Sequence, residues 1–146
     1  MHTRTLVIVL GLSVSALMGC ATSGVRRIDS GSGYELSAVS VAPRPGTTLV
    51  AGQPVTFKIT VKYHLEAADT GHVILIPQDE RGTSLVLGRE QASQVVRKGS
   101  GQVTISDSVT VPPGIRQVQL FVLLVPKGYT RASGQLFMNF PVRAAN

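Results

Sequence analysis

The sequence predicts an all-β sandwich, and two observations carry this prediction. Apolar and polar residues alternate strictly from Val55 to Leu65, so one face of that segment is buried and the other is wet. About seven segments with β-like texture recur at short intervals between Gly and Pro residues, and none has the periodicity of an amphipathic helix. This pattern favours two packed antiparallel sheets over any fold that contains helices.

Turn-forming residues bound each predicted strand. Val55–Leu65 starts after Gly52-Gln53-Pro54, and as a helix its apolar positions would surround the whole surface. Gln91–Lys98 is either a weak strand or part of a loop. The predicted strands are Tyr34–Val41, Val55–Leu65, His72–Ile76, Ser84–Leu87, Gln102–Val111, Arg116–Val125 and Gln135–Val142.

Strands of this number and spacing over Tyr34–Arg143 resemble an immunoglobulin-like or fibronectin-type-III-like sandwich. The resemblance implies one antiparallel domain of about seven strands. It also implies a spacer or a binding surface, since such modules serve mostly in these roles on bacterial envelopes. The resemblance rests on spacing and alternation, because the chain has no Trp and only one Cys.

The N-terminus has the layout of a cleaved secretory signal, predicted over residues 1–19. His2 and Arg4 form a short positive start, and Leu6–Met18 follows without a charge. As a helix, Leu6–Met18 would be about 20 Å long, which is shorter than a hydrocarbon core of about 30 Å. The segment is therefore expected to be removed rather than to span a membrane.

Leu17-Met18-Gly19-Cys20 resembles the lipobox of bacterial lipoproteins. The resemblance implies cleavage between Gly19 and Cys20 and a diacylglyceryl thioether on Cys20, which is the only cysteine in the chain. With Ala21 next, it further implies an outer-membrane location facing the periplasm if the envelope is Gram-negative. The alternative is an ordinary secreted protein in which Cys20 is incidental. Residues 20–33 are then the lipidated N-terminus and a flexible tether rich in Gly and Ser, ahead of the domain at residues 34–143.

Composition and motifs argue against several classes of function. The net charge is +6, but the basic residues are scattered and form no stripe interleaved with aromatic residues, so no nucleic-acid partner is expected. The chain has no G-x-S-x-G or H-E-x-x-H motif, and its only thiol is assigned to lipid. We therefore expect no enzyme activity and no cofactor.

Broken alternation predicts an apolar surface on the outside of one sheet. Arg116–Val125 is apolar at both odd and even positions from Leu120 onward, so some of these residues must face away from the core. In immunoglobulin-like topology this strand is a neighbour of His72–Ile76 and Gln135–Val142 in one sheet. The alternative is that loops or the tether cover this face, or that the central strands are buried on both sides. The predicted partner surface consists of Ile74, Ile76, Phe121, Leu123 and Phe137.

A second hypothesis places a metal at the expected turn between Val55–Leu65 and His72–Ile76. Imidazole and carboxylate groups are suitable ligands for zinc, and the turn would bring together His64, Glu66, Asp69 and His72. Their spacing matches no established zinc motif, so the alternative is a solvated loop.

Asp107 interrupts a buried face. It lies in phase with Ile105 and Val109, where a lone carboxylate would be costly. We therefore expect either a β-bulge at Asp107 or an edge strand whose charge blocks pairing between sheets.

These observations predict a lipid-anchored cell-envelope protein with a non-enzymatic binding or assembly role. Its expected partners are the membrane, through lipid on Cys20, and another envelope protein. The competing functions are a metal- or small-ligand-binding domain that uses the segment from His64 to His72, and a purely structural spacer.

Overall fold

The computed structural model describes residues 23–29 and 34–146, and all regular structure in these residues is β-strand. The strands alternate between buried and exposed residues, as the sequence predicts. The strands are β1 (Arg26–Asp29), β2 (Tyr34–Ala42), β3 (Leu49–Val50), β4 (Pro54–Asp79), β5 (Ser93–Thr110), β6 (Gln117–Pro126) and β7 (Gly134–Arg143).

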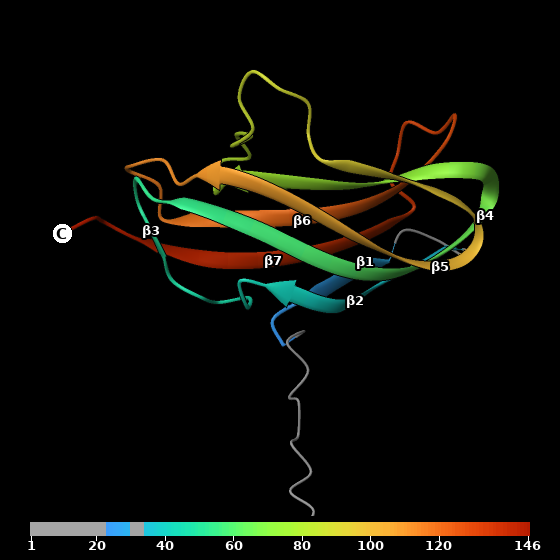
Figure 1. The fold of residues 1–146 in the computed structure, drawn as a ribbon, viewed down its shortest axis with the longest axis horizontal. Coiled ribbons are helices and arrows are strands. Elements are labelled where there is room, and N and C mark those ends of the chain that lie inside the picture. The colour runs from blue at the N-terminus through green and yellow to red at the C-terminus, as the bar shows by residue number, and fades with distance from the viewer. Residues whose placement is uncertain (1–22, 30–33) are drawn as a thin grey trace, which may run out of the picture.

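β4 is one long strand that belongs to both layers of the sandwich (Figure 1). Its first half pairs with β2 and its second half with β6, while β5 follows it through both halves. The register between β4 and β5 shifts between Leu65 and Thr70. The prediction of two strands joined by a turn at this point was wrong, because residues 66–69 contain no Gly or Pro to end the strand.

The two layers form an immunoglobulin-like antiparallel sandwich, which confirms the predicted fold class. One layer contains β2, the first half of β4, which pairs with it, and the part of β5 that pairs with that half of β4. The other contains the rest of β4 and β5 together with β6, β7 and β1, and β3 runs parallel to the end of β7. β6 lies between β4 and β7, so these three strands are neighbours in one layer, as the immunoglobulin-like resemblance implies.

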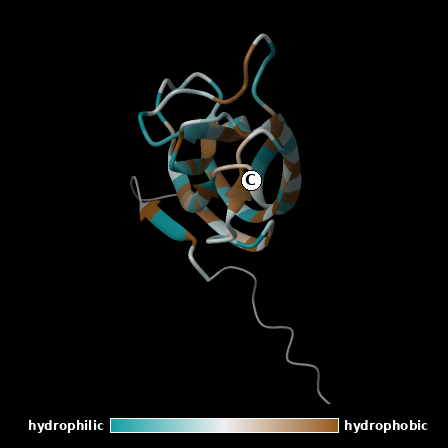
Figure 2. Cartoon of the chain, turned by 90° about the vertical axis from the view of Figure 1, so that its left-hand side faces the viewer, coloured by the Kyte–Doolittle hydropathy of each residue, from teal (hydrophilic) through white to brown (hydrophobic). Residues whose placement is uncertain are grey.

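The core lies between the layers and is entirely apolar at its centre. Seen end-on, the strands surround it, and both hydrophobic and hydrophilic residues occur along them (Figure 2). The rings of Phe57 and Phe140 meet across the layers with centroids 5.1 Å apart. Leu36 lies against Gly134, where an added Cβ would come within 3.1 Å of the Leu36 Cβ. The core therefore depends on side-chain packing between β2, β4 and β7.

Gly71 is required where β4 crosses from one layer to the other. A Cβ built at this position would lie 2.9 Å from the carbonyl oxygen of Val125 and 3.2 Å from Leu65. Only glycine lets the strand approach both β6 and the core this closely. This residue sets how tightly β4 and β6 pair at the bend.

Asp107 is buried on an edge strand and is paired with an arginine. Among the described residues β5 pairs only with β4, so the predicted edge strand is found. The predicted bulge is absent, since Asp107 lies opposite Phe57 in a continuous register. A guanidinium Nη2 of Arg89 donates to Asp107 Oδ1 and, at 2.8 Å, to the carbonyl of Ser108. The charge is satisfied by a loop residue rather than by a distortion of the strand.

Two further expectations were wrong. Ser84–Leu87 is not a strand, because only Ser84 bridges to Gln78 and the segment belongs to the loop after β4. The expected flexible tether contains β1, where Ile28 lies opposite Gln135 on an edge of β7 that would otherwise be unpaired. The undecided segment Gln91–Lys98 forms the start of β5 from Ser93.

Two carboxylates organise the loop that follows β4. Asp79 accepts backbone N–H groups of Arg81 and Thr83, both at 2.8 Å, and pairs with the Arg81 guanidinium. The Thr83 N–H is the largest influence that lowers the pKa of Asp79 below its ordinary value. Glu80 accepts N–H groups of Arg116 and Gln117, and its pKa is lowered chiefly by its own backbone N–H and by these bonds.

Candidate binding face

The outward side of β4, β6 and β7 gathers five apolar side chains on adjacent strands. Ile74 lies opposite Leu123, and Phe121 lies opposite Ile76 on one side and Phe137 on the other. Each is half-buried and keeps part of its side chain exposed. We call this surface, Ile74, Ile76, Phe121, Leu123 and Phe137, the outer apolar face.

The outer apolar face is a packed layer with a shallow hollow. The rings of Phe121 and Phe137 are tilted by 50° with centroids 4.9 Å apart, a separation at which aromatic pairs attract each other. Phe121 of this pair lines a hollow of about 290 Å³ together with Ile76 and Leu123. The amide side chains of Gln78 and Gln135 also line the hollow. The face therefore offers both a ridge of aromatic rings and a depression beside it.

Neighbouring strands extend the apolar area in both directions. Val95 of β5 and Val125 of β6 lie on either side of His72, and the Val95 residue is 64% exposed. On the other edge Ile28 of β1, 45% exposed, lies opposite Gln135. Each strand of this layer from β5 to β1 thus carries an outward apolar residue, with His72 and Gln135 lying among them. Exposed apolar areas of this kind mark interaction sites.

The outward side of the opposite layer has the reverse character. Cross-strand pairs of hydroxyl groups connect β4 and β5 there, with Thr56 and Ser108 at 2.7 Å and Thr60 and Thr104 at 2.8 Å. Lys58 lies between these two pairs in the alternation, Lys62 follows Thr60, and both lysines are exposed. The sandwich therefore has one polar outer face and one apolar outer face, and packing of the core does not require this difference.

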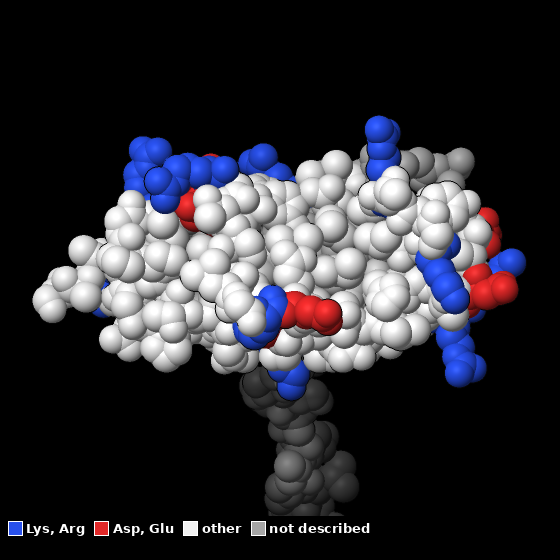
Figure 3. Space-filling model, turned by 90° about the horizontal axis from the view of Figure 1, so that it is seen from above, with Lys and Arg blue, Asp and Glu red and all other residues white. Residues whose placement is uncertain are grey.

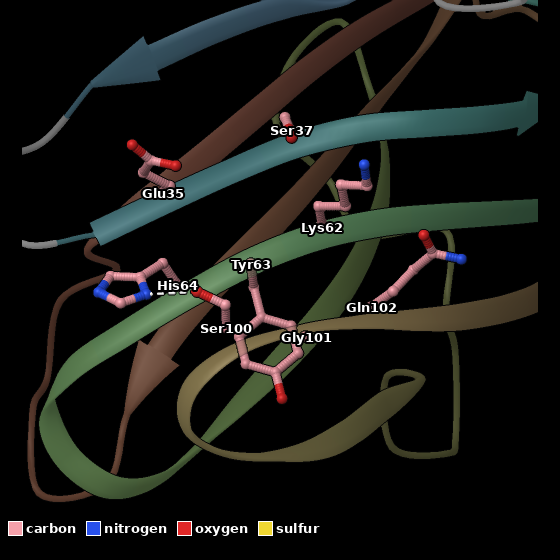
Figure 4. A pocket seen from close by; sticks show the side chains of 8 residues that line it. All are labelled: Glu35, Ser37, Lys62, Tyr63, His64, Ser100, Gly101 and Gln102. Carbon is pink, nitrogen blue, oxygen red and sulfur yellow. Dashed lines mark hydrogen bonds between the residues drawn. The ribbon is translucent and has the colours of Figure 1, made fainter.

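We call the row of cross-strand pairs Thr56–Ser108 and Thr60–Thr104 the hydroxyl ladder. His64 continues this row and lines a hollow of about 450 Å³ (Figure 4). Its Nδ1 lies 2.7 Å from the Ser100 Oγ and its Nε2 lies 2.9 Å from a Glu66 oxygen. Ser100 is directly opposite His64 on β5, so the pair has the geometry of the other cross-strand pairs. No pattern in the sequence indicates the pair of His64 and Ser100, because the register that joins these two residues is long-range. The hollow is lined by Glu35, Ser37, Lys62, Tyr63, His64, Ser100, Gly101 and Gln102.

The four predicted metal ligands do not come together. His64 contacts Glu66, but both ring nitrogens of His64 are engaged in hydrogen bonds. His72 faces outward on the other layer between Val95 and Val125, because residues 64–72 form a continuous bent strand. Within ranges 23–29 and 34–146, no group of three His, Cys, Asp or Glu side chains could hold a metal ion.

The predicted lipidation site at Cys20 and the cleavage site after Gly19 lie outside the described residues. The part of the chain that the structure describes contains no helix long and apolar enough to cross a membrane. On the side shown in Figure 3, Lys and Arg lie in separate groups rather than in one continuous stripe.

Comparison with known proteins assigns no family. No family model matches the chain, and no curated protein matches it. Among solved structures, the chain is similar to the CARDB domain of the PF1109 protein from Pyrococcus furiosus, solved in complex with di-metal ions. That similarity has a TM-score of 0.40 and 9% identity, covering 77% of this chain and 92% of that one. Northeast Structural Genomics Consortium target SoR45 gives a TM-score of 0.28 at 9% identity, with 83% of each chain covered. Both TM-scores are below 0.5, so the fold assignment rests on the strand pairing described above.

Proposed function

We propose that this protein is a lipid-anchored component of the cell envelope with a non-enzymatic binding or assembly role. The outer apolar face carries that role. The observation that supports the proposal is the asymmetry of the sandwich: Phe121, Leu123 and Phe137 face outward on one layer, while hydroxyl groups occupy the matching positions of the other. An outward row of apolar residues contributes nothing to the core and lowers solubility unless something covers it.

The anchor in this proposal is lipid on Cys20. The supporting features are the lipobox-like sequence Leu17-Met18-Gly19-Cys20 and the absence of any other cysteine. An outer-membrane location facing the periplasm follows from Ala21 if the envelope is Gram-negative. Intact-mass analysis of protein from membranes is expected to give a chain that starts at Cys20 and carries acyl groups. A mature chain without added lipid would contradict this part of the proposal.

The binding role is tested by changing the outer apolar face without touching the core. Phe121→Lys with Leu123→Ser replaces two half-buried apolar side chains with polar ones. The core is left intact, because the buried residues of β6 are the alternate ones. Chemical crosslinking in intact cells is expected to lose the adducts that the unaltered protein forms.

The matched control is Thr60→Lys with Thr104→Ser, which introduces the same two residue types on the outward side of the other layer. It should retain the adducts. If both pairs of substitutions leave the adduct pattern unchanged, or both remove it equally while the domain stays folded, the outer apolar face is not the binding surface.

A further inference from the structure

We propose that the outer apolar face docks on the surface of the anionic membrane to which the protein is tethered. This proposal rests on the proposed function and names the surface that the apolar face contacts. Membrane contact would hold the domain in one orientation, with the β4–β6–β7 layer against lipid and the hydroxyl ladder toward the aqueous side. Three observations support it.

The first observation is where the tether joins the fold. β1 lies on the free edge of β7, and its first residue, Arg26, is directly opposite Phe137 of the outer apolar face. Five residues separate Arg26 from Cys20 in the sequence. Six steps along an extended chain span at most about 22 Å. A lipid on Cys20 therefore keeps this edge of the layer within that distance of the bilayer surface.

The second observation is the charge around the face. Arg26 is exposed at one end, on the side of β1 that carries Ile28. Arg97, opposite Thr70, and Lys127, whose N–H donates to the Thr70 carbonyl, are exposed at the other end. Among the described residues, no Asp or Glu occupies an outward position in the strand pairing between these two ends. Cations that flank an apolar surface match anionic head groups above acyl chains.

The third observation is the polarity between those cations. The outward positions alternate along β6 from Gln119 through Phe121 and Leu123 to Val125, so large apolar side chains fill the middle of the face. Gln78 and Gln119, joined by a hydrogen bond of 3.4 Å, close one end with neutral groups. Aromatic and aliphatic residues on a surface rimmed by amides and cations are typical of proteins that rest in the interfacial region of a membrane.

A second copy of the chain fits this surface less well. Pairing two such faces would bring Arg26, Arg97 and Lys127 of one copy toward the same cations of the other, with no carboxylate in the face to offset them. Like charges across an interface oppose association. A protein partner in place of lipid is an outcome that the experiment below detects.

The test uses fluorescence from introduced tryptophan, because the chain contains none. The lipidated protein carrying Phe121→Trp is reconstituted into vesicles of phosphatidylcholine with phosphatidylglycerol whose acyl chains are brominated. Thr104→Trp, on the hydroxyl ladder, is the matched control. Docking predicts at least twofold stronger quenching for F121W than for T104W. It also predicts a blue-shifted emission for F121W, and a loss of the difference in vesicles of phosphatidylcholine alone.

Leu123→Trp provides a second reporter if F121W does not fold, as judged by its far-ultraviolet circular dichroism. Equal quenching of the apolar-face and ladder reporters, or quenching of neither, overturns membrane docking. So does an F121W emission that shifts with protein concentration in the absence of lipid, which would indicate a second copy. Protein adducts at the face in cells without quenching in vesicles would assign it to a protein partner. Intact mass decides separately whether Cys20 carries lipid, so failure of the anchor and failure of docking are distinguishable.

Discussion

Removing the cation that faces the buried carboxylate of β5 should destabilise the domain. The Asp107 side chain is 4% exposed, its Oδ2 has no hydrogen-bond partner among the described residues, and its Oδ1 depends on Arg89. Arg89→Ala therefore leaves a carboxylate in an apolar layer without a counter-charge. Loss of one partner of a fully buried pair costs about 3–5 kcal/mol.

The effect here should be smaller, because the Arg89 side chain is 45% exposed and its charge is partly screened. We expect R89A to lower the free energy of unfolding by about 1–3 kcal/mol. For a domain of this size each kcal/mol corresponds to roughly 3–5 °C in Tm. Urea unfolding followed by circular dichroism measures the change as a lower midpoint with an unchanged slope.

A second substitution separates loss of the ion pair from loss of loop packing. Asp107→Leu in the R89A background removes the unpaired charge and should recover a large part of the lost stability, since apolar replacements of buried pairs are tolerated. Exposed Arg44→Ala is the control for removing an arginine elsewhere. The reasoning is refuted if R89A unfolds at the same midpoint as the unaltered protein, or if the double variant is no more stable than R89A.

Three further predictions concern acid, packing and metal. Because the folded-state pKa values of Asp79 and Glu80 are lowered, their stabilisation is complete above the ordinary carboxyl values of 3.8 and 4.5 and is lost as pH falls below them. Thermal unfolding from pH 7 to pH 3 should show a smaller decline for Asp79→Asn with Glu80→Gln, and an unchanged decline would contradict the assignment. Gly71→Ala should lower the free energy of unfolding in urea by about 1–3 kcal/mol, because the new methyl group meets the Val125 carbonyl. An unchanged free energy of unfolding would show that β6 can shift to make room for the methyl group. Calorimetric titration with zinc should give the same heat for the unaltered protein and for His64→Ala, since no metal-binding group forms among the described residues. Binding heat that is lost in His64→Ala would restore the metal hypothesis.

Alternation made much of the fold predictable. The period of two identified the buried positions of Val55–Leu65, and broken alternation at Phe121 and Leu123 identified outward apolar positions on β6. That β4, β6 and β7 are neighbours in one layer followed from immunoglobulin-like topology. These features are local in sequence or belong to a common architecture, so one chain is enough to infer them.

Features that depend on long-range register were not predictable. The Arg89 and Asp107 pair joins a loop to an edge strand, and His64 meets Ser100 only because β4 and β5 keep one register through Leu65. β1 was missed because four residues between Gly and Ser segments carry too little periodicity to stand out. Its strand structure comes from the unpaired edge of β7, a tertiary effect that local propensity does not encode.

Site-specific photocrosslinking in intact cells tests the binding face most directly. A photoreactive residue at Phe121 should form adducts several-fold more often than the same residue at Thr104, because the two positions face outward on opposite layers. Digestion and mass spectrometry identify each adduct as lipid or protein. Equal adduct yields at the two positions would contradict the claim that this protein acts through its outer apolar face.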